Sequence, residues 1–319
     1  MRRVLAGFAA FAMSAIWSVA HAEPASRDPY LWLEEINGAR ARTWVQSRNE
    51  TTLGELRKDP SYRQTREAAD QILSFRDAIP RDQVAGRYVF SFQQSSKHPF
   101  GLWRRTTMDA YREGNPKWET RFDLDAQNAI AGRSQQWKGA KCLPPDFGRC
   151  LIILSGPAGT GVTVREFDTD RGEYVVDGFE IGEAPTEVEW VDTDTLLVAT
   201  NWGRNTLTTG GRPRIVKIWS RGQPMRDAQT VYEGDREDAE VLPRTLFSND
   251  GKVSLFIVRQ QSSQASQLFH VDESGRAMRI TVPPSAQFKG MLQRQLLFFL
   301  NADWRTGWTA RPPPWRWWR

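Results

Sequence analysis

The stretch from Arg87 to Asp125, RYVFSFQQSSKHPFGLWRRTTMDAYREGNPKWETRFDLD, decides the fold class of this chain. It contains three segments rich in aromatic and β-branched residues: YVFSF at 88–92, GLWRR at 101–105 and WETRFDL at 118–124. Polar, Gly, Pro and Asn residues separate the three, which is typical of short strands joined by turns. Consecutive strands at this spacing predict an up-and-down sheet of about four strands, the size of one propeller blade.

The same pattern continues over residues 80–303. Short apolar runs recur there, and they alternate with turns that contain Gly, Asp or Asn. Strands at this density, with no helical runs between them, predict a mainly β fold, either a sandwich or a propeller. Asp and Asn at the turns before apolar strands favour propeller blades. The predicted strands cover 150–154, 162–167, 187–191, 196–200, 214–219, 229–232, 253–259, 267–270 and 296–300.

Residues 23–79 have a different, helical pattern. DPYLWLEE at 28–35 holds a compact apolar patch that needs a packing partner. A helix is predicted from Ala39 to the Asp59-Pro60 stop, and a second from Ser61 to Ser74. Both are expected to be amphipathic and to cover a surface supplied by another part of the molecule. The apolar positions of the two helices are Trp44, Val45, Leu53, Leu56, Tyr62, Ala69, Ile72 and Leu73.

The charge of the chain is concentrated at its two ends. Of 319 residues, 25% are charged and 39% hydrophobic, which is ordinary for a globular protein, and the net charge is +5. Arg2 and Arg3 lie at the N-terminus, and four arginines follow the last acid, Asp303. The remaining body is close to neutral and offers no basic face for phosphates, so nucleic acid is not an expected partner.

Residues 1–22 have the form of a secretory signal peptide. Arg2 and Arg3 begin it, an apolar run follows from Val4, and Ala20-His21-Ala22 supplies small residues for cleavage after Ala22. The alternative is a membrane anchor, but the apolar core is short. No other segment reaches the roughly 20 apolar residues needed to span a bilayer. The sequence therefore predicts an exported protein, periplasmic or secreted, with no membrane span.

The predicted export makes the two cysteines candidates for a disulfide. Cys142 and Cys150 flank the short loop from Leu143 to Arg149, which contains two prolines. In an oxidising compartment such a pair can close a disulfide, and the alternative is two unpaired thiols. A zinc site is not expected because further ligands at suitable spacing are missing.

The sequence lacks recognisable catalytic and cofactor motifs. Ser155 has Ile153 and Pro157 where a nucleophile elbow requires glycines. The glycines that follow at 156, 159 and 161 fit a tight turn between strands better than a phosphate loop. Once the signal has been removed only two histidines remain, His98 in a predicted turn and His270 on a predicted strand, and neither has a triad setting. We therefore assign no catalytic, cofactor-binding or metal-binding residue and expect no cofactor.

The last sixteen residues, 304–319, differ from everything before them. They contain five tryptophans, four arginines and three consecutive prolines. One interpretation is a cationic aromatic tail that binds a membrane or an anionic partner. The other is a frame change in GC-rich coding DNA, whose shifted codons yield Trp, Arg, Pro and Gly.

The chain resembles the prolyl oligopeptidase family of serine peptidases. DPYLWLEE at 28–35, followed by Trp44-Val45, Asn49 and Thr51, is similar to the N-terminal segment of that family. The similarity to an exported bacterial subgroup then runs in order from residue 28 to residue 304. It is carried by GLWRRTT at 101–107, WET at 118–120, WKGA at 137–140, LLVAT at 196–200 and RIVK at 214–217.

This resemblance implies a propeller that admits short peptides to a separate α/β-hydrolase domain holding the catalytic Ser, Asp and His. No position in this sequence matches those catalytic residues. The resemblance therefore implies about four of seven blades, truncated before the hydrolase domain, and a chain that is inactive alone. Its expected partners are short peptides and the missing hydrolase domain or a complementing chain. The alternatives are a periplasmic binding module for peptides or proteins, or a frame-shifted remnant without function.

Overall fold

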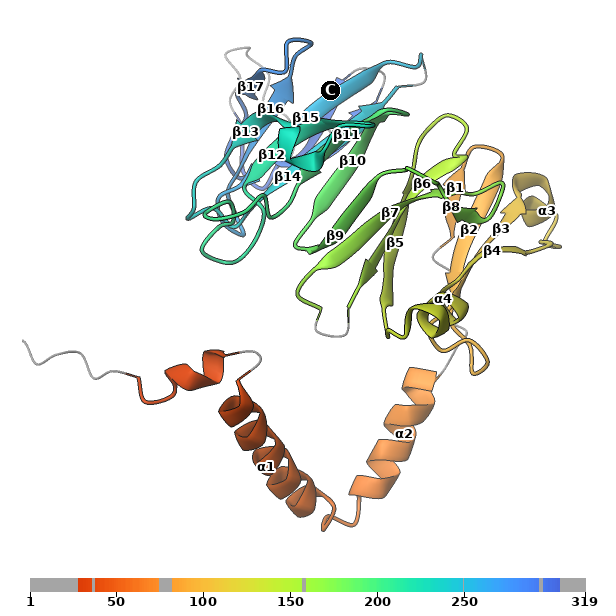
Figure 1. Cartoon of the computed structure of the whole chain (residues 1–319), viewed down its shortest axis with the longest axis vertical. Helices are drawn as coiled ribbons and strands as arrows, with labels where there is room; N and C mark the ends of the chain where they lie inside the picture. The colour runs from red at the N-terminus through yellow and green to blue at the C-terminus, as the bar shows by residue number, and fades with distance from the viewer. Residues whose placement is uncertain are drawn as a thin grey trace, which may run out of the picture. The chain divides into compact units, whose positions relative to one another are not determined.

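Antiparallel strands joined by short turns make up most of the chain in the computed structural model (Figure 1). The chain divides into two units, one ending at Phe75 and the other beginning at Arg76. Each unit is described by itself below. The structure describes residues 28–35, 38–74, 82–156, 159–248, 250–292 and 295–304. The predicted signal peptide, 1–22, and the tail beyond Trp304 lie outside these ranges.

The first unit contains the two predicted helices. They are α1, Ala39–Leu56, and α2, Tyr62–Ser74, and the short 3₁₀ helix η1, Leu31–Glu34, precedes them. The apolar patch of η1 finds its partner on α1, because the Trp32 ring meets Trp44 edge-on at 6.1 Å between centroids. Arg40 also lies 4.1 Å from the centre of the Trp32 ring. Apolar side chains along the helices, including Val45 and Ile72, remain exposed.

The second unit begins with the sheet that the 87–125 stretch predicts. Tyr88 pairs with Thr107 and Trp103 with Phe122, so the strands form a meander in chain order. The fourth strand comes from just upstream of the stretch. The first sheet comprises β1 (Gln83–Ala85), β2 (Tyr88–Gln93), β3 (Leu102–Thr107) and β4 (Glu119–Asp123).

The prediction that no helix interrupts the strands is wrong. Two short helices follow strands of the first sheet: α3, Met108–Arg112, and α4, Leu124–Ala131. The Asp123 carboxylate caps α4 by accepting a hydrogen bond from the Ala126 amide at 2.9 Å. Gly132 ends α4 in the left-handed region at φ 59°, a conformation that glycine adopts without strain. Local capping chemistry therefore overrides the surrounding strand pattern.

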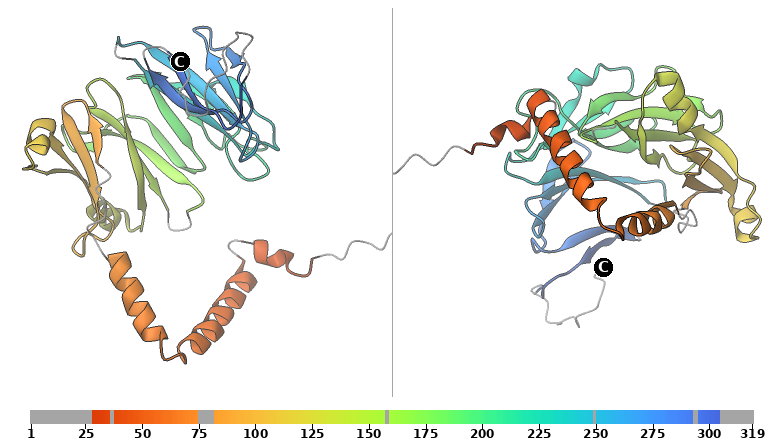
Figure 2. Two further views of the ribbon diagram at one scale, coloured as in Figure 1. Left: turned by 180° about the vertical axis from the view of Figure 1, so that it is seen from behind. Right: turned by 90° about the horizontal axis from the view of Figure 1, so that it is seen from below.

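Three further sheets repeat the meander, and a two-stranded hairpin follows them (Figures 1 and 2). In the second sheet, an extra strand pairs with β7. The second sheet contains β5 (Gln136–Cys142), β6 (Arg149–Ser155), β7 (Val162–Asp168), β8 (Glu173–Tyr174) and β9 (Glu180–Ala184). The third contains β10 (Glu187–Asp192), β11 (Thr195–Ala199), β12 (Ile215–Ser220) and β13 (Gln229–Glu233), with the 3₁₀ helix η2 (Met225–Asp227) before β13. The fourth contains β14 (Glu240–Phe247), β15 (Val253–Gln260), β16 (Ser266–Val271) and β17 (Ala277–Ile280), and the hairpin is β18 (Gln287–Leu292) with β19 (Gln295–Phe299).

Apolar layers join each sheet to the next, and alternate residues of one strand enter different layers. On β6, Ile152 packs in the layer with the first sheet, whereas Leu151 packs in the layer with the third. On β11, Leu196 faces the second sheet and Leu197 faces the fourth. Because strand side chains alternate with period two, a strand buried on both faces contributes to two layers. Face-to-face stacking of four-stranded meanders in this way is the architecture of a β-propeller.

Candidate functional site

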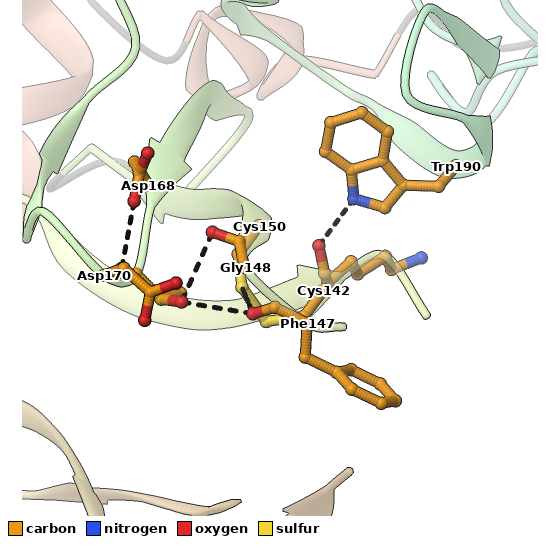
Figure 3. Close-up of a disulfide and its surroundings, with 9 residues drawn as sticks. Cys142, Phe147, Gly148, Cys150, Asp168, Asp170 and Trp190 are labelled. Atoms are coloured by element: carbon orange, nitrogen blue, oxygen red, sulfur yellow. Dashed lines mark hydrogen bonds between the residues drawn. A yellow bond between two sulfur atoms is a disulfide. The ribbon is translucent and has the colours of Figure 1, made fainter. Parts of the chain in front are cut away.

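A disulfide closes the hairpin between β5 and β6. Cys142 and Cys150 are direct partners in the strand register, their Cα atoms lie 3.9 Å apart, and their sulfurs are bonded. Cys150 is fully buried. The Thr169 hydroxyl donates a hydrogen bond to the Phe147 carbonyl at 3.1 Å, which ties the turn of this hairpin to the end of β7 (Figure 3). The disulfide and this hydrogen bond together fix one end of the second sheet.

Reduction of this disulfide is expected to lower the free energy of unfolding by about 2–3 kcal/mol, because it releases a short closed loop in the unfolded chain. The measurement is urea unfolding of the protein with and without a reductant. The double variant C142S/C150S should show the same loss and should no longer respond to the reductant. A midpoint that does not change on reduction would contradict the expectation.

Arginine–carboxylate pairs join the sheets beside the apolar layers. Glu166 on β7 is only 2% exposed, and both of its oxygens accept hydrogen bonds from Arg221, at 2.8 and 3.1 Å. The Phe179 amide donates a third, at 3.0 Å. The hydrogen bonds to Glu166 raise the pKa of Arg221, so the guanidinium stays charged. This pair links the second sheet to the third.

A similar pair links the first sheet to the second. The Arg105 side chain on β3 is 9% exposed and donates a hydrogen bond to Asp170, in the turn between β7 and β8, at 2.7 Å. This hydrogen bond lowers the pKa of Asp170. Charged side chains, in addition to the packing of the apolar layers, therefore fix the relative positions of successive sheets.

A third cluster lies on the first strands of three sheets. The Lys141 ammonium on β5 donates to Glu189 on β10 at 2.8 Å and to the Val188 carbonyl at 2.9 Å. The same Glu189 oxygen lies 3.6 Å from a guanidinium nitrogen of Arg244 on β14. These side chains are half-buried, with 31%, 19% and 37% of Lys141, Glu189 and Arg244 exposed. We call these three residues the inner-strand cluster.

His98, Asp123 and Asp125 are close enough together to hold a metal ion, a grouping that sequence reasoning did not find. The residues present do not favour one. Both oxygens of Asp125 accept backbone hydrogen bonds, from Phe100 at 3.1 Å and Gly101 at 2.9 Å, and Asp123 caps α4. The N-terminus of a helix carries partial positive charge, which opposes a cation. We assign these carboxylates to closing the turn before β3 and to starting α4.

The described residues contain no arrangement for nucleophilic catalysis around either histidine. His98 lies in the turn between β2 and β3, and its ring nitrogen is 3.9 Å from Asp125. His270 lies on β16 with its ring 5.4 Å from that of Phe256. No serine hydroxyl in the described part of the chain hydrogen-bonds to either imidazole, although such a bond is the first geometric sign of a Ser–His pair. Nor is any described helix long and apolar enough to cross a bilayer.

Stacked four-stranded meanders with charged inter-sheet contacts define this chain as a β-propeller protein preceded by helices. It belongs to the prolyl oligopeptidase family, because residues 18–299 match the family description "Prolyl oligopeptidase, N-terminal beta-propeller domain". The resemblance drawn from the sequence is thereby confirmed, as is the mainly β class with two helices ahead of it.

Individual relatives agree with this assignment. An uncharacterized peptidase of Sinorhizobium fredii is 34% identical over 286 residues, which cover 87% of this chain and 39% of that protein. One of Rickettsia prowazekii is 24% identical and covers 86% and 40%. A post-proline cleaving enzyme from Rickettsia typhi superimposes with a TM-score of 0.76 at 25% identity, over 85% of this chain and 41% of its own. Oligopeptidase B of Trypanosoma brucei shares the fold at 14% identity and TM-score 0.60, over 91% of this chain and 39% of its own. The chain thus spans about two fifths of the length of these relatives.

Proposed function

We propose that this chain is the substrate-gating propeller part of a prolyl-oligopeptidase-like serine peptidase that acts on short peptides, and that the chain does not hydrolyse peptides by itself. The observation that carries the proposal is the match of residues 18–299 to the family's N-terminal propeller domain. The relatives that the chain matches are described as peptidases, and it corresponds to about two fifths of each. The rest of such a protein, or a complementing chain, would supply the hydrolytic step.

The expected inactivity follows from the chemistry of acyl transfer. Peptide hydrolysis through an acyl-enzyme needs a nucleophile activated by a base, and the base must be oriented by a third group. Neither His98 nor His270 has a serine hydroxyl bonded to its ring in the described residues. Ser155 is buried on β6 and lacks the flanking glycines of a nucleophile elbow.

Purified protein is expected to show no turnover of proline-containing chromogenic peptides. The assay needs a control reaction with a complete serine peptidase and a serine-directed inhibitor. Turnover that the inhibitor blocks would overturn the claim of inactivity. A separate measurement of peptide binding, by fluorescence anisotropy, tests the gating role, because a propeller that admits peptides should bind them without cleaving them.

We also propose that the protein is exported and that its signal is cleaved after Ala22. The charged start, the apolar run and the small residues at 20–22 support this proposal, and the disulfide suits an oxidising compartment. Mass spectrometry of protein recovered from the periplasm should give a mature N-terminus at Glu23. Recovery of the full-length chain from the cytoplasm alone would contradict the proposal.

A further inference from the structure

We propose that the Arg244 guanidinium binds a carboxylate of an acidic peptide, and that Glu189 and Lys141 hold it in position. The inference deepens the proposed function and rests on it, because it requires that peptides reach the inner-strand cluster. It names a substrate class, peptides with an acidic side chain, that family membership alone does not give.

The cluster connects three sheets at their first strands. β5, β10 and β14 are each the edge strand of their sheet. Lys141 bridges from β5 to β10, and the Trp190 indole donates back to the Lys141 carbonyl at 2.8 Å (Figure 3). Glu189 then bridges from β10 to Arg244 on β14. The blades of a propeller surround a central channel, and the edge strands that contact one another across three successive sheets are placed to line it. The proposed function brings peptides to this channel.

Arg244 is fixed from two sides but keeps its outer edge free. Its Nη1 atom donates to the Pro243 carbonyl at 2.8 Å and lies 3.6 Å from Glu189, which is longer than a hydrogen bond. Its Nε and Nη2 atoms make no hydrogen bond with the described residues, and neither is a buried, unsatisfied atom. Two parallel N–H groups in a fixed fork match the two oxygens of a carboxylate. Fixing the side chain in advance reduces the entropy that binding would cost.

The charge of the cluster selects an anion. Two cations share one carboxylate oxygen, so one positive charge is left without a partner. Glu187 and Glu240, at the first positions of β10 and β14, make no ion pair with either cation among the described residues. Two of the three N–H donors of the Lys141 ammonium are already hydrogen-bonded, to the Val188 carbonyl and to Glu189. Arg244, the most exposed of the three, is therefore the group that meets the ligand.

The experiment compares two short fluorescent peptides with blocked ends that differ only by Asp or Asn at one position. Their affinities for the full chain are measured by anisotropy at low ionic strength. The Asp peptide should bind about tenfold more tightly, as expected for one added charge-assisted contact. Arg244→Gln should reduce this preference to within about twofold, and Arg244→Lys should keep only part of it, because an ammonium lacks the fork.

Arg226→Gln is the matched control. Arg226 lies on the same unit and is 84% exposed beside Asp227, so its loss should leave the preference unchanged. Circular dichroism of each variant verifies folding. Equal binding of the two peptides by the wild type, or an unchanged preference in Arg244→Gln, would overturn the inference while leaving the gating role standing. Failure of both peptides to bind would overturn the gating role as well.

Discussion

Replacing Glu166 with alanine should lower the free energy of unfolding by about 2–4 kcal/mol, because it removes a buried acceptor of two charge-assisted hydrogen bonds and one backbone hydrogen bond. Glu166 is almost fully buried and accepts hydrogen bonds from the Nη1 and Nη2 atoms of Arg221 and from the Phe179 amide. Its removal leaves the Phe179 amide without this acceptor, and Arg221 keeps only its hydrogen bonds to Thr193 and Asp194, in the turn between β10 and β11 of its own sheet. The hydrogen-bonded link from Arg221 to the second sheet is lost. Chemical denaturation followed by circular dichroism measures the loss.

Glu180→Ala is the matched control for this change. Glu180 pairs with Arg165 at 3.5 Å, but 65% of Glu180 and 44% of Arg165 is exposed. An exposed pair contributes at most about 1 kcal/mol, so the control should lose far less stability. The double variant Glu166→Leu/Arg221→Met should lose less than Glu166→Ala, because it removes both charges. Equal losses in Glu166→Ala and Glu180→Ala would show that the buried pair does not hold the sheets together.

Trp190→Ala should cost a similar amount, about 3–5 kcal/mol, through the cavity it leaves. Trp190 is 2% exposed in the apolar layer between the second and third sheets. Its indole N–H also donates to the Lys141 carbonyl, at 2.8 Å across the sheet junction. Truncation therefore removes buried ring atoms and leaves that carbonyl without its donor.

Trp190→Phe separates these two contributions. Phenylalanine keeps most of the ring volume but has no N–H. The free energy of unfolding of Trp190→Phe should therefore fall by only about 1–2 kcal/mol, which corresponds to one hydrogen bond and a small cavity. Unfolding should be followed by far-ultraviolet circular dichroism, because the substitution alters tryptophan fluorescence. A Trp190→Ala protein as stable as Trp190→Phe would mean that the layer closes over the missing ring.

The sequence was sufficient to predict pairs of strands that are neighbours in the chain and are joined by a short turn. β10 and β11 were predicted because Asp192, Thr193 and Asp194 separate two apolar runs, and the structure pairs them. β14 was missed because Pro243 lies inside it and breaks the expected pattern. The structure accommodates that proline opposite Ile257 in the ladder with β15. The helix α4 was missed because its capping residue, Asp123, was assigned to the end of a strand.

The side-chain clusters could not be predicted in the same way. Glu166 and Arg221 are 55 residues apart, and Lys141 and Glu189 are 48 apart. Their contacts follow from the stacking of sheets, and a single sequence has no periodic signal for which charged residues meet across a sheet junction. Cys142 and Cys150 were a candidate pair because only eight positions separate them. Local patterns therefore predicted the strands, while the cluster that carries the substrate inference required the three-dimensional structure.

Because β11 contributes to two apolar layers, the packing of this strand depends more on its length than on which aliphatic residues it contains. Leu196 and Leu197 are neighbours in the chain, yet they contact different sheets. Inserting one residue before them would turn each side chain to the opposite face of the strand. Leu196 would then face the fourth sheet and Leu197 the second. Natural variants of this protein should therefore tolerate exchanges among Leu, Ile and Val in β11 and accumulate insertions only in the turns that flank it.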